Sequence, residues 1–146
     1  MLSDRIIEAP SGGYVLLRAQ VFEVLSTYKQ TESKSEAGGI LVGCYRGDHI
    51  EIIDASVPFP TDKRSRYHFN RHKKGHQEFA EQAWSASDRT MTYVGEWHTH
   101  PELVPSPSPQ DIASWSKGLP NRDMVLLIQG LDELYMEVHS PRRAHS

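Results

Sequence analysis

Apolar and polar residues form two kinds of pattern along the chain. Short apolar runs bounded by glycine, proline or charged residues are typical of strands, and some alternate as half-buried strands do. Spacings of three and four residues between apolar positions are typical of helices packed on a core. The predicted strands are residues 14–17, 38–45, 49–57, 91–97, 124–130 and 133–139. The predicted helices lie around residues 21–28, 75–87 and 109–118.

The order of these elements, β-α-β-β-α-β-α-β-β, predicts an α/β fold with a mixed β-sheet flanked by helices. The chain has 146 residues, which is long enough to bury one core, and we expect residues 1–146 to form a single domain. The segment RYHFN, residues 66–70, is a candidate further strand. The tail, residues 140–146, is expected to be flexible.

The composition is that of a globular protein. Hydrophobic residues make up 38% and charged residues 24% of the chain, which excludes a disordered composition. The single cysteine, Cys44, excludes an internal disulfide and any zinc site built from several cysteines. No apolar run approaches the roughly 20 residues of a membrane helix, and residues 1–13 lack the apolar centre of a signal peptide. We therefore expect a cytoplasmic protein with no membrane partner.

Charge is distributed unevenly. The formal net charge is −3, yet residues 63–74 contain six lysine or arginine residues and no acid. Such a segment can contact a nucleic acid or an acidic protein, or it can be a solvated loop beside a helix. Because the chain as a whole is acidic and carries no motif of a nucleic-acid reader, no nucleic-acid partner is expected.

The most specific chemistry lies in the stretch GEWHTHPELVPSPSPQD, residues 95–111. Side chains alternate along a strand, so His98 and His100 point to one side and Thr99 points to the other. Two imidazoles at a strand end can reach one zinc ion, which in catalytic sites takes three protein ligands and keeps one open position. The third ligand must come from another segment.

Ser108 and Asp111 are typical of a helix start. Serine suits the N-cap, Pro109 suits the first helical position, and an acid at the third position suits the helix dipole. These two residues could therefore do no more than cap a helix. A capped helix end also holds its side chains rigidly, so Asp111 remains a candidate third zinc ligand.

Together these residues resemble the zinc signature of the JAMM (MPN+) metalloproteases. His98-Thr99-His100 is followed by seven residues and Ser108, and then by two residues and Asp111. That family also places a glutamate far upstream, just before a glycine-rich strand, and Glu36 stands before GGILVG here. The resemblance implies the JAB/MPN architecture, which is layered like that of the cytidine deaminases. It extends over the order of elements in most of the chain.

The resemblance also implies a role for each matching residue. His98, His100 and Asp111 would bind one Zn²⁺ per chain. Glu36 would take the proton of the attacking water, and Ser108 would stabilise the oxyanion. Each role fits the general chemistry of metal-assisted hydrolysis. Without the resemblance, Glu36 would be interpreted as a solvent-facing acid at a strand start.

The family resemblance implies a peptidase or isopeptidase whose substrate is the C-terminal tail of a ubiquitin-like protein or its conjugate. The small size and the Gly-Glu-Trp-His-Thr-His-Pro stretch resemble deconjugating proteases of bacterial antiviral operons of the CBASS type. In the family, the segment before the second helix borders the groove for the substrate tail. Arg64, Arg66 and Phe69 are therefore candidate substrate contacts.

Several alternatives remain beside this hypothesis. Glu96 lies on the same strand face as His98 and could be the base, or it could orient an imidazole. The spacing of His68, His72 and His76 would suit a metal on a helix, but Gly75 disfavours that interpretation. A zinc deaminase is excluded because its motif needs two cysteines and this chain has one. The protein could instead be a catalytically silent interaction module, or it could release a sulfur-carrier product.

Overall fold

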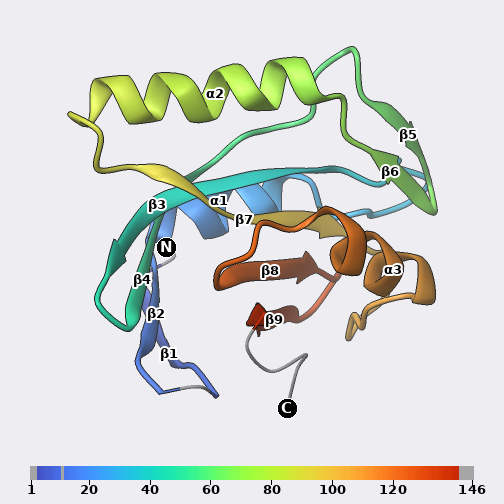
Figure 1. The fold of residues 1–146 in the computed structure, drawn as a ribbon. Coiled ribbons are helices and arrows are strands. Elements are labelled where there is room, and N and C mark those ends of the chain that lie inside the picture. The colour runs from blue at the N-terminus through green and yellow to red at the C-terminus, as the bar shows by residue number, and fades with distance from the viewer. Residues whose placement is uncertain (1–2, 11, 142–146) are drawn as a thin grey trace.

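A curled, seven-stranded mixed sheet forms the centre of the molecule in the computed structural model, which describes residues 3–10 and 12–141 (Figure 1). The strands are β1 (Arg5–Glu8), β2 (Tyr14–Leu17), β3 (Gly38–Arg46), β4 (His49–Ala55), β5 (Lys63–Ser65), β6 (His68–Asn70), β7 (Thr92–Thr99), β8 (Met124–Gln129) and β9 (Leu134–His139). The helices are α1 (Ala19–Thr27), α2 (Lys73–Ala86) and α3 (Pro109–Gly118). The predicted α/β fold with helices packed on a mixed sheet is confirmed.

The strand order in the large sheet is β1-β2-β4-β3-β7-β8-β9. The pairs β2–β4 and β7–β8 are parallel, and the other neighbours are antiparallel. Strands β5 and β6 form a separate antiparallel hairpin at one end of the sheet (Figure 1). This topology places β7, the strand that ends in the two histidines, between β3 and β8.

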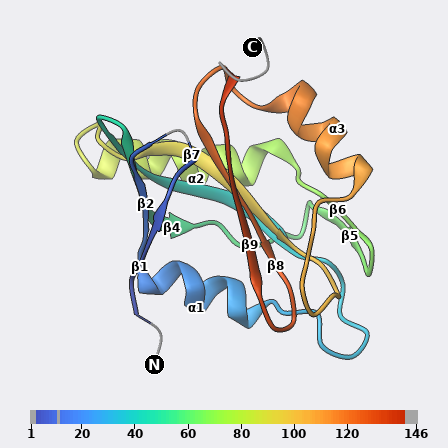
Figure 2. The same cartoon turned by 90° about the horizontal axis from the view of Figure 1, so that it is seen from below.

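The helices cover both faces of the sheet. Helix α1 lies on one face and α2 lies across the other, as Figures 1 and 2 show from two directions. Successive side chains of β8 point to opposite faces of the sheet, and both faces are covered. Val125 and Leu127 belong to the main core with α1, whereas Leu126 and Ile128 pack against Trp115 of α3. The strands that are buried on both faces are those that the apolar runs predicted.

Three elements differ from the sequence-based expectation, among them β5, which was not predicted. Strand β1 was not predicted, because its exposed residues show no apolar periodicity and it is held by pairing with β2. Helix α2 begins at Lys73 rather than at Gly75, because the side chain of His72 caps it by accepting a hydrogen bond from the Lys74 amide. The candidate strand at residues 66–70 corresponds to β6.

Two further expectations concerned membrane-spanning segments and the C-terminal tail, residues 140–146. Among the residues that the structure describes, no helix is both long and apolar enough to cross a membrane. Most of the tail that was expected to be flexible, residues 142–146, lies outside the described residues.

Candidate metal centre

The end of β7 brings a glutamate beside the two histidines. Gly38 of β3 pairs with His98 of β7 in antiparallel register, so Glu36 lies across from His100, two residues beyond that pair. The backbone continues this pairing, because the Thr99 amide donates to the Ala37 carbonyl over 2.9 Å. Residues separated by two positions share a sheet face, so Glu36 and both histidines lie on the same side. The Glu36 side chain is buried, with the residue 6% exposed.

The N-terminus of α3 brings Asp111 to the same place. Ser108 is the N-cap: its hydroxyl accepts a hydrogen bond from the Asp111 amide over 3.1 Å. The Asp111 carboxylate in turn accepts from the Ser108 amide over 2.9 Å, which completes a capping box. The prediction that these residues start a helix is therefore confirmed. The same Oδ2 atom that closes the box also faces both imidazoles.

Three candidate ligand atoms form a nearly equilateral triangle. His98 Nε2 lies 3.1 Å from His100 Nε2, and each of these nitrogens lies 3.2 Å from Asp111 Oδ2. Ligands bound tetrahedrally to zinc at ~2.0–2.1 Å lie about 3.3–3.4 Å apart, so the spacing fits one ion of this size. Ligating atoms of Glu36, His98 and His100 also lie within 4.8 Å of one another, so the cluster could bind an ion in more than one way.

A sequence model described as "Prokaryotic homologs of the JAB domain" matches residues 18–141, which is most of the chain. The chain belongs to this family. A protein named CD-NTase/cGAS isopeptidase from Pseudomonas aeruginosa (strain BWHPSA011 / Pa011) is 41% identical over 122 residues, covering 78% of this chain and 77% of that protein. A protein of the same name from Vibrio cholerae is 34% identical over 140 residues, covering 93% and 90%.

The fold of this JAB-family protein also has a counterpart among solved structures. The solution structure of protein DSY2949 from Desulfitobacterium hafniense matches it with a TM-score of 0.61, covering 85% of this chain and 88% of that one. At 19% sequence identity, this likeness shows the fold alone.

Burial and neighbouring groups shift the pKa values of the two acids of the JAB-family site, Glu36 and Asp111, in opposite directions. Burial raises the pKa of Glu36 to about 7; His100 lowers it and Asp111 raises it further. Burial would also raise the pKa of Asp111, but hydrogen bonds with His100 and His98 outweigh it and hold that pKa far below its usual range. The pKa of His100 is raised, because its contact with Asp111 outweighs burial. Asp111 is thus ionised at neutral pH, whereas Glu36 can exchange a proton there.

We expect the buried Glu36 to destabilise the metal-free protein at high pH. Its folded-state pKa lies above the unfolded value of 4.5, so ionisation is disfavoured in the folded protein. Both states are protonated at pH 4, and stability falls as the pH rises from about 4.5 to about 7. Glu36→Gln should therefore stabilise the metal-free protein at pH 8 by about 3 kcal/mol and have little effect at pH 4. Urea unfolding at both pH values measures this difference, and an equal effect at the two pH values would contradict it.

Glu102 is a further contact of the cluster that sequence reasoning missed. Its carboxylate lies 3.0 Å from His100 Nδ1, the ring nitrogen that faces away from the triangle. Such a partner fixes the tautomer that leaves Nε2 unprotonated for a metal. The position two residues after His100 was the only signal in the sequence, because alternation along an extended chain places both on one side.

Glu102→Ala should weaken metal binding by ~10–100-fold, the usual cost of losing such an outer partner. Competition with a chromogenic chelator measures the affinity. Glu133→Ala is a suitable control, because it removes another exposed acid from the adjacent turn between β8 and β9 without touching His100. An unchanged affinity in Glu102→Ala would show that the contact does not orient the imidazole.

The cluster lies at the junction of connected cavities. A cavity of about 590 Å³ lies on the His100 side and includes Tyr67, Glu102 and Ser108 in its lining. A smaller one of about 270 Å³ lies on the His98 side and includes Glu96. Both are lined by Glu36, Phe69, Asn70, Asp111 and Ser114, so they form one groove past the triangle.

The predicted substrate contacts have different surroundings. Phe69 lines both cavities of the groove, and its ring packs against Gly38 so closely that a Cβ there would lie 2.7 Å from it. Arg64 Nε donates to the Glu36 carbonyl over 2.9 Å, and Arg66 Nη1 donates to the Glu32 carbonyl over 2.5 Å. Both arginines therefore also make internal contacts. Their role toward substrate stays a prediction.

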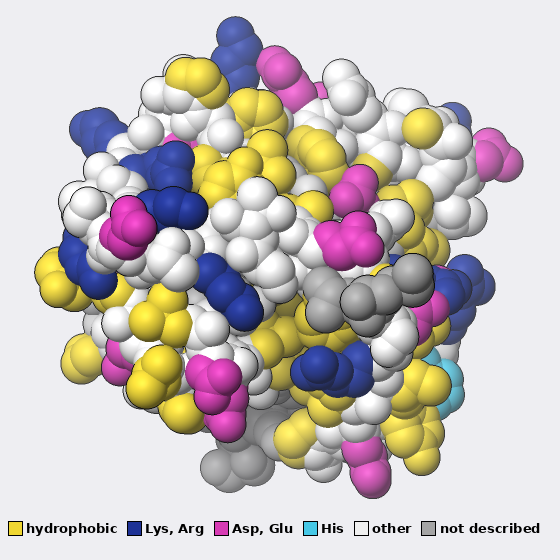
Figure 3. Space-filling view, turned by 180° about the vertical axis from the view of Figure 1, so that it is seen from behind, with side chains coloured by type: hydrophobic (Ala, Val, Ile, Leu, Met, Phe, Trp, Pro, Cys, Tyr) yellow, Lys and Arg dark blue, Asp and Glu magenta, His cyan; other side chains and the backbone are white. Residues whose placement is uncertain are grey.

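The basic segment 63–74 is only partly free for a partner. Arg64 and Arg66 make the backbone contacts described above. Arg71 is also engaged, because it forms an ion pair of 2.9 Å with Glu96. Lys63, Lys73 and Lys74 remain exposed. In the space-filling view from behind, lysine and arginine side chains gather toward the edge where β5 and β6 lie, on the left of Figure 3.

Glu96 and His76, two other candidates from the sequence, form hydrogen bonds outside the His98–His100–Asp111 triangle. Glu96 accepts hydrogen bonds from Arg71 and from the Tyr93 hydroxyl, at 2.9 and 3.0 Å, and no hydrogen bond between Glu96 and an imidazole is found in the described chain. His76 is buried between the Ser56 hydroxyl at 2.6 Å and the Asp62 carboxylate at 2.8 Å. These contacts give His76 a structural environment.

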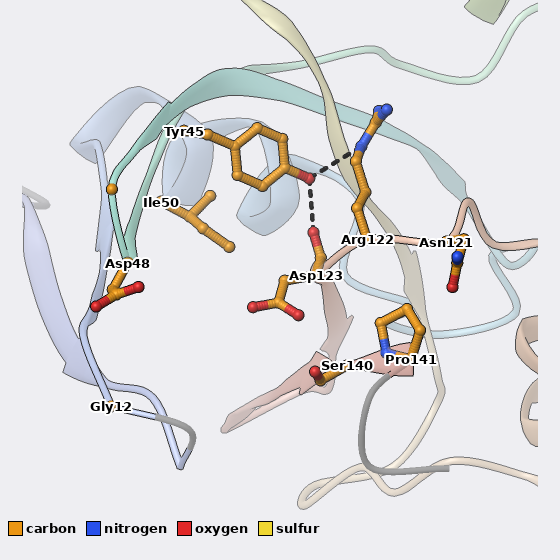
Figure 4. A pocket seen from close by; sticks show the side chains of 10 residues that line it. Gly12, Tyr45, Asp48, Ile50, Asn121, Arg122, Asp123, Ser140 and Pro141 are labelled. Atoms are coloured by element: carbon orange, nitrogen blue, oxygen red, sulfur yellow. Dashed lines mark hydrogen bonds between the residues drawn. The ribbon is translucent and has the colours of Figure 1, made fainter. Parts of the chain in front are cut away.

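A separate cavity of about 810 Å³ lies at the other end of β3 (Figure 4). Its lining includes Tyr45, Arg122 and Asp123, and the Tyr45 hydroxyl donates to the Asp123 carbonyl while Arg122 donates to that hydroxyl. Among residues 3–10 and 12–141, no histidine or cysteine lines this cavity. Its chemistry therefore does not compete with the cluster as a candidate metal centre.

Proposed function

We propose that this protein is a zinc-dependent isopeptidase that cleaves after the C-terminal tail of a ubiquitin-like protein. The observation that carries the proposal is the meeting of the His98–His100–Asp111 triangle with one buried glutamate, Glu36, on the same sheet face. The names of the two relatives support hydrolysis of an isopeptide bond. They also suggest a CD-NTase/cGAS protein as the conjugated partner. A role in bacterial antiviral defence is proposed from the resemblance of the sequence motif alone.

Each residue then has a defined task. Zinc held by His98, His100 and Asp111 would supply Lewis acidity, lowering the pKa of water toward ~7 and polarising the scissile carbonyl. Glu36 accepts a proton from the attacking water and returns a proton to the departing amine. The Ser108 hydroxyl accepts a hydrogen bond from the Asp111 amide, which leaves its own proton for donation to the oxyanion.

The groove suits an extended chain. Strand β6 pairs with β5 along one edge, and no strand pairs with its other edge among the described residues. Residues of β6 line both cavities beside the triangle. An extended tail can add to such an edge through backbone hydrogen bonds, which demand little of its sequence. Phe69, Arg64 and Arg66 are the proposed side-chain contacts for this tail.

The test combines metal analysis with cleavage assays. The purified protein should hold about one zinc ion per chain, the number that three ligands and one open position imply. It should release a ubiquitin-like protein from a lysine conjugate by cutting after the terminal glycine. A linear fusion tests precursor processing, and a ubiquitin-like sulfur carrier with a small molecule amide-linked to its terminal glycine tests release of a sulfur-carrier product. Absence of zinc, or no cleavage of any of these, would indicate a silent interaction module.

A further inference from the structure

Gln30 is a buried amide whose hydrogen bonds connect three parts of the site. It follows α1 and is 1% exposed. Its Oε1 accepts from the Thr99 hydroxyl over 2.8 Å. Its Nε2 donates to the Lys34 carbonyl over 3.2 Å and to the Arg66 carbonyl over 2.7 Å. The two carbonyls need donors, so the amide can have only this orientation.

The first connection leads to the metal-binding strand. Thr99 lies between the two histidines and is fully buried on the opposite face of β7. Its hydroxyl donates to Gln30 and accepts from the Ala37 amide over 2.9 Å. Ala37 is the residue next to Glu36. The Gln30–Thr99 pair thus joins the strand that carries the histidines to the backbone that carries the glutamate.

The second connection leads to the β5–β6 hairpin. The Gln30 amide holds the turn of this hairpin at Arg66. The hairpin in turn holds both backbone polar groups of Glu36, because the Glu36 amide donates to the Ser65 carbonyl over 2.6 Å and Arg64 donates to the Glu36 carbonyl. The third connection, to Lys34, fixes the loop that leads into Glu36.

We propose that Gln30 is a positioning residue of the hydrolase, which holds Glu36 in register with the metal-binding strand and with the hairpin beside the groove. This proposal rests on the proposed function, because it assigns Glu36 the role of base. Glu36 has no side-chain hydrogen bond that fixes its carboxylate among the described contacts, so its position depends on its backbone. Misplacing a reacting group by about 1 Å can reduce the rate on the order of 10²-fold.

A purely structural role for Gln30 predicts a different result. Replacing a buried, fully paired amide destabilises a protein whether or not it positions a base. Loss of stability alone would leave kcat unchanged in the molecules that remain folded. A positioning role predicts a lower kcat in folded, metal-loaded protein, with little change in KM and in metal affinity.

Gln30→Met tests the proposal, because methionine has a similar volume but cannot form any of the three hydrogen bonds. We expect kcat for the lysine conjugate to fall on the order of 10²-fold. Zinc affinity, measured by chelator competition, should stay unchanged because no metal ligand is touched. In the metal-free protein, amide hydrogen exchange should become faster at Ala37 and Glu36, which lose the support of Thr99 and the hairpin.

Thr99 variants provide a rescue test of the same connection. Thr99→Val removes the hydroxyl and should lower kcat as Gln30→Met does. Thr99→Ser keeps the hydroxyl and should retain most of the activity. Leu25→Ala is the matched control, since it removes a fully buried side chain from α1, the helix before Gln30, without touching the network. It should lower thermal stability and leave kcat unchanged.

Two outcomes would overturn the proposal. One is a kcat for Gln30→Met that stays within about twofold of the wild type, and the other is unchanged exchange at Ala37 and Glu36. A wild-type protein that cleaves none of the substrates would instead contradict the proposed function. The exchange measurement needs no substrate and no metal, so it tests the connection from Gln30 to Glu36 even in that case.

Discussion

Glu36→Gln should reduce kcat for cleavage of a ubiquitin-like conjugate by about 10²–10⁴-fold, the usual contribution of a positioned general acid–base group. Glutamine has nearly the same shape and leaves the backbone contacts of residue 36 with Ser65 and Arg64 intact. It cannot accept a proton from water or return one to the leaving amine. Single-turnover cleavage by protein with a verified zinc content measures the loss.

A matched variant decides between the two acids on this face. Glu96→Gln changes an acid that also lines the groove but is paired with Arg71 and Tyr93. Both of these side chains donate to the Oε2 atom of Glu96, so this carboxylate is engaged by contacts other than the histidines. Its replacement should change kcat only a few-fold, far less than loss of a general base would. If Glu96→Gln abolished cleavage and Glu36→Gln did not, the base would be Glu96.

The sequence predicted those elements whose signal is local. Strands β3, β7 and β8 appear as apolar runs because the sheet is covered on both faces, and α3 appears through Ser108, Pro109 and Asp111 at its start. Strands β1 and β5 have no such signal, whereas β6 lies within the candidate strand at residues 66–70. Strands β1 and β5 are short and mostly exposed, and they form by pairing with the next strand along the chain, β1 with β2 and β5 with β6.

The candidate site divides in the same way. His98, His100 and Asp111 belong to one strand, one loop and one helix start, so spacing and capping rules suffice to bring them together. Glu36 reaches them only through the register of β3 against β7, which spacing cannot reveal, and it was found by resemblance. Gln30 and Glu102 were missed, because a single polar residue in a sequence does not show which distant carbonyl or imidazole it will meet.

Arg64 shows that a charged residue can make an internal contact that the sequence does not reveal. A cluster of cations suggests a surface for a partner, and Arg64 is indeed exposed. Its guanidinium nevertheless donates to the backbone of Glu36, so its removal would affect the proposed base as well as substrate binding. Lys63, also exposed and in the same strand, is therefore a cleaner probe of charge at this surface.

Asp111→Ala should reduce the affinity for zinc more than any variant of a residue that contacts a ligand, because it removes one of the three proposed ligands. We expect the loss in affinity to exceed the ~10–100-fold expected for Glu102→Ala. Cleavage should become undetectable at zinc concentrations that saturate the wild type. Zinc content after dialysis and competition with a chelator measure the effect directly.

The dual role of Asp111 requires a second variant, because its carboxylate also closes the capping box of α3. Ser108→Ala removes the N-cap hydroxyl, which should cost about 1 kcal/mol of stability, but it leaves the carboxylate in place. Its zinc affinity should therefore match the wild type. If Asp111→Ala kept zinc with wild-type affinity, the ligands would be Glu36, His98 and His100, whose ligating atoms also lie within 4.8 Å of one another. Glu36 would then be a ligand and could not serve as the base, so this one measurement decides the assignment of both acids.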